Sequence, residues 1–476
     1  MDLKISRMFG KYRELLVYLN VRGIFMRALC TLFFAAMAAG SSFAQEIASL
    51  QLAKTIYGNI TPKSITYGGN GNFYAQNMMY SHNITVYDRK YRLIKTISDK
   101  IDLSDYGFAE YDTLVSGSPV EAAASHSGKY LWVTNYRMFG EGFDNPGSDG
   151  CKISKGYDSS FVYKINTQSL KVEAVVQVGC VPKYIAITPD NQYALVSNWC
   201  SGDLSVIATD SCEEIRRIDI GRYPRGIAVD SRSRFAYVAI MGSTKIARVD
   251  LNDFSVKMLH DAGSKPRHLC IDSQDKYLYA TLNAESKVVK IDLATLAVVD
   301  SAHTERAPRS MTLSPDNSFL YITNYFSNSL SVIRTDSMKP VQTVTTGTHP
   351  IGVAYDPETN HVWVACYSGC IQVFKNVPQE KSQSVALAVS PAKNDLMQPS
   401  TGGYHIVVGA FREEQNLKKA MNKCIKAGYQ PYIINPDGKV KKVSCIALES
   451  KEAAIEELAK VKQRLDAGAW ILRQQS

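Results

Sequence analysis

A proline recurs through the middle of this chain at a spacing that restricts it to a repeat architecture. Five of these prolines lie 42 residues apart: Pro182, Pro224, Pro266, Pro308 and Pro350. Two earlier ones belong to the same series with insertions, because Pro119 lies 63 residues before Pro182 and Pro62 lies 57 before Pro119. Seven units of about 40 residues, each with several short strands, predict an all-β seven-bladed propeller, one blade per unit.

Each unit repeats one order of strands and turns. The proline is followed by a short apolar strand such as 226–229, and a polar turn such as 315–317 precedes a second strand such as 319–324. A third strand ends near an aspartate, as at 287–292. Alternating β-branched and polar residues between turns indicate half-buried antiparallel strands. A β-sandwich is the alternative fold, but a sandwich has no reason to repeat at this period.

The two ends of the repeat region are predicted to pair. The last unit ends after 370–374, which is only its third strand. The segment 53–58, before the first marker proline, is similar to 342–347, the fourth strand of the preceding unit. We therefore expect the first strand to complete the last blade, which removes two open sheet edges and closes the ring.

Second strands carry the motif of a known family: 132–135 reads WVTN, 196–198 reads VSN and 321–324 reads YITN. Over about residues 50–376 the chain resembles the seven-bladed YVTN propellers, related to surface-layer repeats and to periplasmic propellers of the YncE type. Blade 4 departs from the motif at 238–241, which lacks the asparagine. The resemblance implies the fold, and it says little of function because propellers host many activities.

Residues 1–44 have the features of a secretory signal peptide. Met26 is the expected true start, Arg27 supplies charge, 29–39 is an apolar run, and 42–44 (SFA) is a small-residue cleavage site. A membrane anchor is the competing interpretation, but this apolar run is short for a bilayer. The sequence thus predicts an exported, periplasmic or envelope protein without a transmembrane anchor.

The net charge of +9 is concentrated at the two ends of the chain. Residues 1–44 contribute +4 and residues 401–476 contribute +5, so the predicted propeller, 45–376, is close to neutral together with the linker. A neutral body argues against a general nucleic-acid or membrane surface, although it permits a local patch. Propellers of the YncE type are thought to contact nucleic acid, but the predicted export makes a nucleic-acid partner unexpected here.

Nine cysteines remain after the predicted cleavage, and some are expected to be bridged in an exported protein. Cys200 falls in a loop that the repeat register places near two others, so Cys151–Cys200 and Cys180–Cys200 are alternative disulfides. Cys366 and Cys370 flank a short turn and are a further candidate pair. A zinc site at these two lacks a second ligand pair nearby, and we predict neither metal nor cofactor.

After residue 376 the repeat stops. Residues 377–402 mix Pro, Ser, Gln and Gly without periodicity, as expected for a linker. Residues 403–476 then show strand and helix patterns in the order βαββαβ, with helices near 413–427 and 452–465. This order predicts a small α+β domain whose four-stranded sheet has both helices on one face.

The pattern of 404–411 (YHIVVGAF), 427–429 (AGY) and 469–472 (AWIL) resembles a SPOR domain. The resemblance covers 403–473 and implies binding to peptidoglycan glycan strands stripped of their stem peptides. Two departures are Val407, where glutamine is frequent, and Ile446, where glycine is usual. Alternation with the expected core nominates His405, Val407, Lys442 and Ser444 for the exposed face, with Lys441 nearby. The lysines could meet the lactyl carboxylates, or be only a solvated surface.

One set of cations stands out in the propeller. The residue after the marker proline is basic in five blades: Lys63, Lys183, Arg225, Arg267 and Arg309. Equivalent positions of a closed ring converge on its axis, so these side chains should surround one mouth of the central channel and attract an anion or an acidic partner. The interpretation that the sequence favours slightly is that each cation only pairs with a nearby carboxylate, because Asp and Glu are frequent in the adjoining turns. The propeller histidines show no repeated spacing, and no catalytic grouping is evident.

These observations favour a non-enzymatic envelope protein that binds peptidoglycan through its C-terminal domain and offers the propeller to a ligand or partner. The insertion of blade 2, at 138–157, is a candidate contact loop. The rival interpretation is a wall-tethered propeller enzyme, a lactonase, another hydrolase or a redox protein.

Overall fold

The computed structural model describes residues 49–377, apart from 112, 155 and 260, and residues 403–474, apart from 428, 430, 435–439, 449 and 466–468. The predicted signal peptide and almost all of the predicted linker lie outside the described residues. The chain divides into two compact units, one ending at Glu380 and one beginning at Lys381, and each is described by itself. No helix among the described residues has the length and apolar character needed to cross a bilayer.

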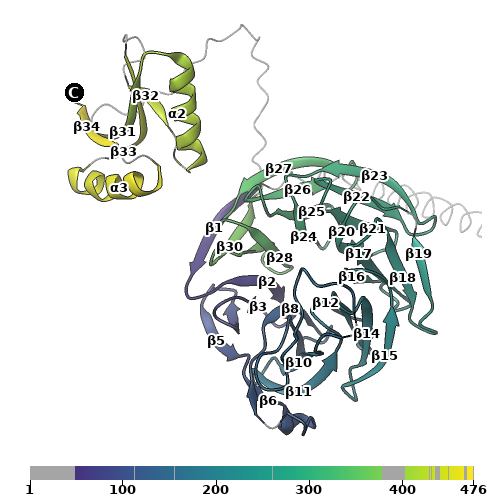
Figure 1. The fold of residues 1–476 in the computed structure, drawn as a ribbon. Helices are drawn as coiled ribbons and strands as arrows, with labels where there is room; N and C mark the ends of the chain where they lie inside the picture. The colour runs from purple at the N-terminus through teal and green to yellow at the C-terminus, as the bar shows by residue number, and fades with distance from the viewer. Residues whose placement is uncertain are drawn as a thin grey trace, which may run out of the picture. The chain divides into compact units, whose positions relative to one another are not determined.

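The first unit contains seven four-stranded antiparallel sheets arranged around a common centre (Figure 1), and a two-stranded sheet of β6 (Ile101–Asp102) and β7 (Leu114–Val115) lies between blades 1 and 2 in the sequence. Blade 1 contains β2 (Pro62–Tyr67), β3 (Asn72–Asn77), β4 (Asn83–Asp88) and β5 (Leu93–Ser98). Blade 2 contains β8 (Pro119–Ala124), β9 (Tyr130–Asn135), β10 (Ser160–Asn166) and β11 (Lys171–Val178). Blade 3 contains β12 (Pro182–Ile187), β13 (Tyr193–Asn198), β14 (Asp203–Ala208) and β15 (Glu213–Asp219).

The remaining blades follow the same order. Blade 4 contains β16 (Pro224–Val229), β17 (Phe235–Ile240), β18 (Ile246–Asp250) and β19 (Val256–Leu259). Blade 5 contains β20 (Pro266–Ile271), β21 (Tyr277–Leu282), β22 (Lys287–Asp292) and β23 (Ala297–His303). Blade 6 contains β24 (Pro308–Leu313), β25 (Phe319–Asn324), β26 (Ser329–Arg334) and β27 (Lys339–Thr345). Blade 7 contains β28 (Pro350–Asp356), β29 (His361–Cys366), β30 (Cys370–Val377) and β1 (Ser49–Tyr57).

Every marker proline is the first residue of the innermost strand of its blade. Proline has no N–H to donate, and the start of a strand is one of the few places in a sheet that tolerates it. Successive innermost strands contact one another from β2 through β28, and β28 contacts β2 again. The seven-bladed ring that the proline spacing predicted is therefore confirmed.

The ring closes through the strand pairing that the sequence predicted. β1 lies antiparallel to β30, with Ser49 opposite Val377 and Tyr57 opposite Cys370, so the first strand of the chain completes the last blade. Beneath this joint the rings of Phe73 and Trp363 are stacked with centroids 4.0 Å apart. The two ends of the repeat region are thus held together by a strand ladder and by an apolar core.

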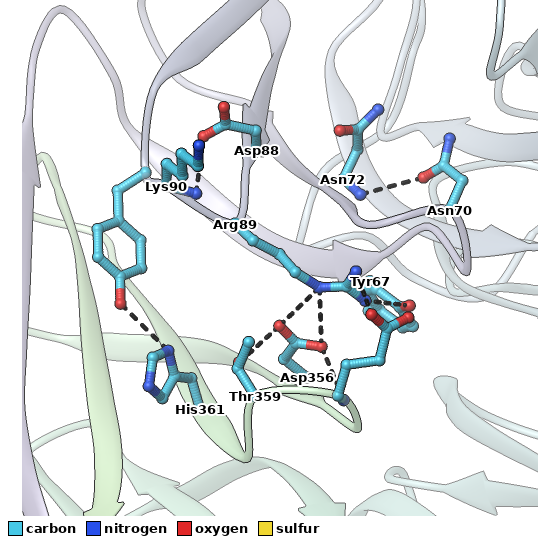
Figure 2. A network of polar contacts seen from close by, with 11 residues as sticks. Tyr67, Asn70, Asn72, Asp88, Arg89, Lys90, Asp356, Thr359 and His361 are labelled. Carbon is cyan, nitrogen blue, oxygen red and sulfur yellow. Dashed lines mark hydrogen bonds and ion pairs between the residues drawn. The ribbon is translucent and has the colours of Figure 1, made fainter.

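A polar network also joins the first blade to the last (Figure 2). Arg89 Nε donates to both carboxylate oxygens of Asp356, at 3.2 and 3.0 Å, and Arg89 Nη2 donates to Tyr67 Oη at 2.8 Å. Arg89 Nη1 lies 2.6 Å from Glu358 Oε2. The Asp356 side chain is only 1% exposed, whereas that of Arg89 is 25% exposed, so the arginine provides the charge that a buried carboxylate requires.

The asparagine of the second-strand motif has a structural role. Asn198 Nδ2 donates to Asp203 Oδ1 at 2.7 Å and to Ser205 Oγ at 2.8 Å, both on β14. Asn324 makes the corresponding bonds to Ser329 and Ser331 on β26. A buried amide that joins the end of the second strand to the third satisfies polar groups which would otherwise be costly to bury.

The second unit has the predicted βαββαβ order. Its elements are β31 (Gly403–Phe411), α2 (Glu414–Lys426), β32 (Tyr432–Ile434), β33 (Lys441–Leu448), α3 (Lys451–Arg464) and β34 (Trp470–Gln474). The strands form one sheet in the order β32-β33-β31-β34, and both helices contact it. Ile406 and Val443 pack with Leu417 of α2 and Val461 of α3 in a single core.

Candidate functional site

The cations predicted from the repeat lie at a recurring irregularity of the sheets. In all seven blades the residue after the marker proline falls at a register shift between the first and second strands. A β-bulge leaves a residue unpaired and changes the direction of its side chain, and such bulges are frequent next to functional sites. The fold therefore places the same side chain of each innermost strand outside the regular ladder.

We call Lys63, Lys183, Arg225, Arg267 and Arg309 the cation ring. Lys63, Arg225 and Arg267 are each 7% exposed and Lys183 is 3% exposed. Lys183 forms an ion pair with Asp149. Among the residues that the structure describes, the other four have no ion-pair partner, so the interpretation that each cation is neutralised by a neighbouring carboxylate is wrong for them.

The five cations are close enough to disfavour one another's charge. Burial lowers the pKa of Lys63, and the charge of Arg225 lowers it further. Burial together with Arg225 and Arg309 lowers the pKa of Arg267. Burial lowers the pKa of Lys183 to about 7, with Arg225 and Arg267 adding to the effect and Asp149 opposing it. The ring is thus a region of concentrated positive potential inside a nearly neutral body.

Aromatic and thioether side chains accompany the cations, and this feature was missed at the sequence level. The residues that directly follow the second strands are Met78, Tyr136, Trp199, Met241, Asn283, Tyr325 and Tyr367. In an antiparallel sheet the second strand ends where the first begins, so these residues and the cations share one end of the propeller. The sequence could have identified these residues, because each directly follows the position of the motif asparagine.

Several cations lie over these rings. Lys183 Nζ is 4.2 Å from the ring centre of Tyr136, and Arg309 is 4.0 Å from that of Tyr325. The guanidinium of Arg225 is 5.9 Å from the Trp199 ring. Cation–π contacts of this kind hold a cation in place without neutralising it. Lys183, Arg225 and Arg309 are therefore held in place by aromatic neighbours.

The blade 2 insertion reaches the cation ring. It connects β9 to β10 at the same end of the propeller, and its Asp149 contacts Lys183, accepts a hydrogen bond from Tyr136 Oη at 3.1 Å, and through its carbonyl accepts one from Trp199 Nε1 at 3.2 Å. A disulfide between Cys151 and Cys200, with Cα atoms 5.9 Å apart, ties the insertion to blade 3. The predicted contact loop is therefore fastened beside the candidate site.

The remaining candidate disulfides are not present. Cys180 is a buried free thiol whose Sγ donates to the Tyr157 carbonyl at 3.1 Å, because Cys151 already occupies the sulfur of Cys200. Cys366 and Cys370 lie directly opposite each other at the end of the β29–β30 hairpin, yet both are free. The predictions of a Cys180–Cys200 or a Cys366–Cys370 bridge are therefore wrong in this structure.

On the innermost strands, the polar residues one position after the ring cations, or after their equivalents, are of other types. Tyr184 Oη and His268 Nε2 are hydrogen-bonded at 2.9 Å, and burial, together with Arg225 and Arg267, lowers the pKa of His268 to about 3. Burial raises the pKa of Glu121, which Lys63 and Arg225 oppose. Among the described residues no group of three or more His, Cys, Asp or Glu side chains is arranged to hold a metal ion.

In the C-terminal sheet, three of the five residues predicted for the exposed glycan-binding face are buried. Lys441 and Lys442 are partly exposed, but His405 is 1% exposed and Val407 and Ser444 are fully buried. All three buried residues lie on β31 and β33, the two central strands, where neighbouring strands flank them on both sides. Register shifts on both sides of Val407 interrupt the β31–β33 ladder here, and none of the three side chains projects into solvent.

Sequence reasoning also missed an aromatic residue on this sheet. Trp470 of β34 is 37% exposed, and it lies opposite Val407, which in turn lies opposite Ser444. Directly opposed residues of antiparallel strands share a face, so these three form a row across the sheet, on the side away from Ile406 and Val443. Trp470 is the part of this row that solvent reaches, and alternation from the core residue Ala469 would have identified it.

Comparison with known proteins agrees with both units. Residues 249–382 match the family model "Lactonase, 7-bladed beta-propeller", and residues 400–473 match the SPOR domain. No curated protein sequence matches the chain. Hydrazine synthase of Kuenenia stuttgartiensis is similar in structure, with a TM-score of 0.53, 17% identity, and coverage of 68% of this chain and 98% of that chain. At this identity the likeness concerns the fold alone. The protein is thus a seven-bladed propeller followed by a SPOR domain.

Proposed function

We propose that this protein is an exported component of the cell envelope. Its SPOR domain binds peptidoglycan glycan strands that have lost their stem peptides, and its propeller is a binding scaffold for a ligand or partner. The match of residues 400–473 to the SPOR domain is the observation that carries the proposal. Cell-wall enzymes and division proteins are the classes of partner that such a location would bring into reach.

Export is supported by two independent features. The N-terminal residues 1–44 carry the charge, apolar run and small-residue site of a signal peptide. The Cys151–Cys200 disulfide lies within the folded propeller, and structural disulfides persist in oxidising compartments such as the periplasm. A protein kept in the reducing cytosol would gain little from this bond.

The chemistry of the SPOR sheet suits an acidic glycan. Trp470 offers an exposed aromatic surface against which the apolar face of a sugar can pack, and Lys441 and Lys442 on β33 offer positive charge. A glycan strand freed of peptides presents lactyl carboxylates along its length, and a lysine can pair with each in a charge-assisted hydrogen bond. Val407, in the row with Trp470, makes no hydrogen bond through its side chain, so the aromatic and the lysines are the expected contacts.

For the propeller, the composition of the cation ring supports binding. Five cations, with Tyr136, Trp199 and Tyr325 nearby, can hold an anionic ligand. The match of residues 249–382 to a lactonase-type propeller favours the rival function, hydrolysis of a lactone. Hydrolysis of a lactone that is lost when a ring cation is replaced would support the enzyme.

The test of the envelope role is a pull-down on purified sacculi. The full chain should co-sediment with them, and a chain ending at residue 402 should stay in the supernatant. Binding should increase when the sacculi are first treated with an amidase, which removes stem peptides and exposes naked glycan. A full chain that does not sediment would refute peptidoglycan binding, and indifference to the amidase would refute preference for naked glycan.

A further inference from the structure

The charge inventory around the propeller axis does not balance. The cation ring holds three guanidinium groups and two lysine amines whose pKa values burial lowers, and the two carboxylates that act on it are Asp149, which pairs with Lys183, and Glu121, whose pKa burial raises. Arginine stays protonated in proteins, so Arg225, Arg267 and Arg309 carry positive charge without an ion-pair partner among the described residues, the first two at 7% exposure. Placing a cation in such a position without a partner is expensive, and proteins normally supply a counter-charge or remove the cation. A structural role alone would be better served by uncharged side chains.

The cation ring also contains hydrogen-bond donors that have no acceptor among the described residues. The Lys63 amine and the Arg225 guanidinium have no hydrogen bond to any described residue, and Arg309 Nε is buried without an acceptor. Arg267 Nη1 reaches only the sulfur of Met241, at 3.7 Å. Guanidinium groups are donors only and match the paired oxygens of phosphate and carboxylate groups. The ring therefore offers converging donors that the protein itself does not use.

One carboxylate already lies in this ring. Asp149 contacts Lys183 from the blade 2 insertion, and the Cys151–Cys200 disulfide fixes that insertion two residues away. The contact shows what the ring accepts: an oxyanion beside the ammonium of Lys183, which itself lies over the rings of Tyr136 and Trp199. The remaining four cations extend around the axis from this point and have no equivalent partner among the described residues.

We propose that the cation ring binds a small anion carrying two or more carboxylate or phosphate groups. The low exposure of the ring favours a small ligand, because a broad macromolecular surface could not reach Lys63, Lys183, Arg225 and Arg267, which are 7% exposed or less. The residual charge favours a multivalent one. This inference deepens the proposed role of the propeller as a ligand-binding scaffold, and it does not depend on the SPOR domain.

The test is calorimetric titration of the full chain with citrate and with pyrophosphate, which represent the two chemistries, and with acetate as a monovalent reference. At equal ionic strength at least one multivalent anion should bind ten times or more tightly than acetate, since each charge-assisted hydrogen bond contributes about tenfold or more. The stronger of citrate and pyrophosphate identifies the chemistry. Equal affinity for all three, or no binding, would overturn the proposal.

Variants separate a binding site from a structural one. Arg267→Met removes one ring charge and keeps an apolar chain beside Met241, and we expect it to weaken binding about tenfold. Without ligand its thermal midpoint should be equal to or above that of the wild type, because a repelled buried charge is gone. Arg334→Met, which removes a cation paired with Asp336, is the matched control and should bind normally. Unchanged binding by Arg267→Met would contradict the proposal.

Arg309→Met supplies a second route if Arg267→Met does not fold, with the same expected loss. The envelope role and the anion site are tested independently, because sedimentation with sacculi reports on the SPOR domain and titration reports on the propeller. A chain that binds citrate but not sacculi would keep this inference and remove the envelope role. A chain that binds sacculi but neither multivalent anion would do the reverse.

The pH dependence follows from Lys183. The groups that act on it are Asp149, Arg225, Arg267 and Lys63, with the rings of Tyr136 and Trp199, and burial lowers its pKa to about 7. Its positive charge is present below that pH and is lost as the pH rises through it. Binding of sulfate, whose charge is constant in this range, should therefore be tighter at about pH 6 than at about pH 8. Equal affinity at both values would exclude Lys183 from the site.

Discussion

Loss of the Cys151–Cys200 disulfide should destabilise the propeller measurably. The bond joins residues 49 apart and closes a loop that contains the end of the blade 2 insertion, the rest of blade 2 and the first half of blade 3. In the chain-entropy treatment a loop of this length gives about 4 kcal/mol at 25 °C, as an upper value because the unbridged chain retains some structure. The Cys151→Ser, Cys200→Ser double variant should therefore unfold at a clearly lower denaturant concentration.

The assay is urea unfolding followed by intrinsic fluorescence, with and without a reducing agent. Reduction should shift the wild-type midpoint to that of the double variant and should not affect the double variant. Cys180→Ser is the matched control, because this neighbouring thiol is free and a serine retains a donor for the Tyr157 carbonyl. We expect its change in unfolding free energy to be below about 1 kcal/mol.

A specific outcome would refute this reasoning. If the double variant lost less than about 1 kcal/mol and the wild type did not respond to reduction, the bond would not constrain the unfolded chain as the entropy argument requires.

The same variants also test the candidate site. Asp149 lies two residues from Cys151, so the opened loop should hold its carboxylate less firmly beside Lys183, and the sulfate affinity of the ring should change with it.

Two further predictions concern ring closure and the SPOR sheet. Arg89→Met should lower the free energy of unfolding by about 2–3 kcal/mol, because it leaves the buried carboxylate of Asp356 without its ion-pair partner. Arg92→Met removes an exposed surface ion pair and should lower it by less than about 1 kcal/mol. Equal losses in urea unfolding would contradict the closure role of Arg89. Trp470→Ala should reduce binding to amidase-treated sacculi severalfold, while Ile455→Ala, which truncates a more exposed apolar residue on α3, should not. Identical sedimentation of the two variants would exclude Trp470 from the glycan site.

Local sequence determined the architecture of this protein. The spacing of Pro182 and its equivalents counted the blades because the start of a strand is one of the few places in a sheet that tolerates a residue without an N–H, and each blade uses it at the same position. The similarity of 53–58 to 342–347 identified the strand that closes the ring, because both lie at the same position of the repeat. Alternation and helix patterns gave the βαββαβ order of the second unit in the same way.

Tertiary structure alone decided the chemistry of the two sites. The sequence placed five cations at equivalent positions, but only the fold showed that Asp149 pairs with Lys183 and that the other four have no ion-pair partner among the described residues. It also selected Cys151 as the partner of Cys200, and it buried His405 in a central strand that alternation alone would have exposed. The period of the repeat and the alternation of residues along a strand indicate which face of a sheet a residue occupies. Partners that are distant in sequence, and the depth of each side chain, are set by how the strands pack against one another.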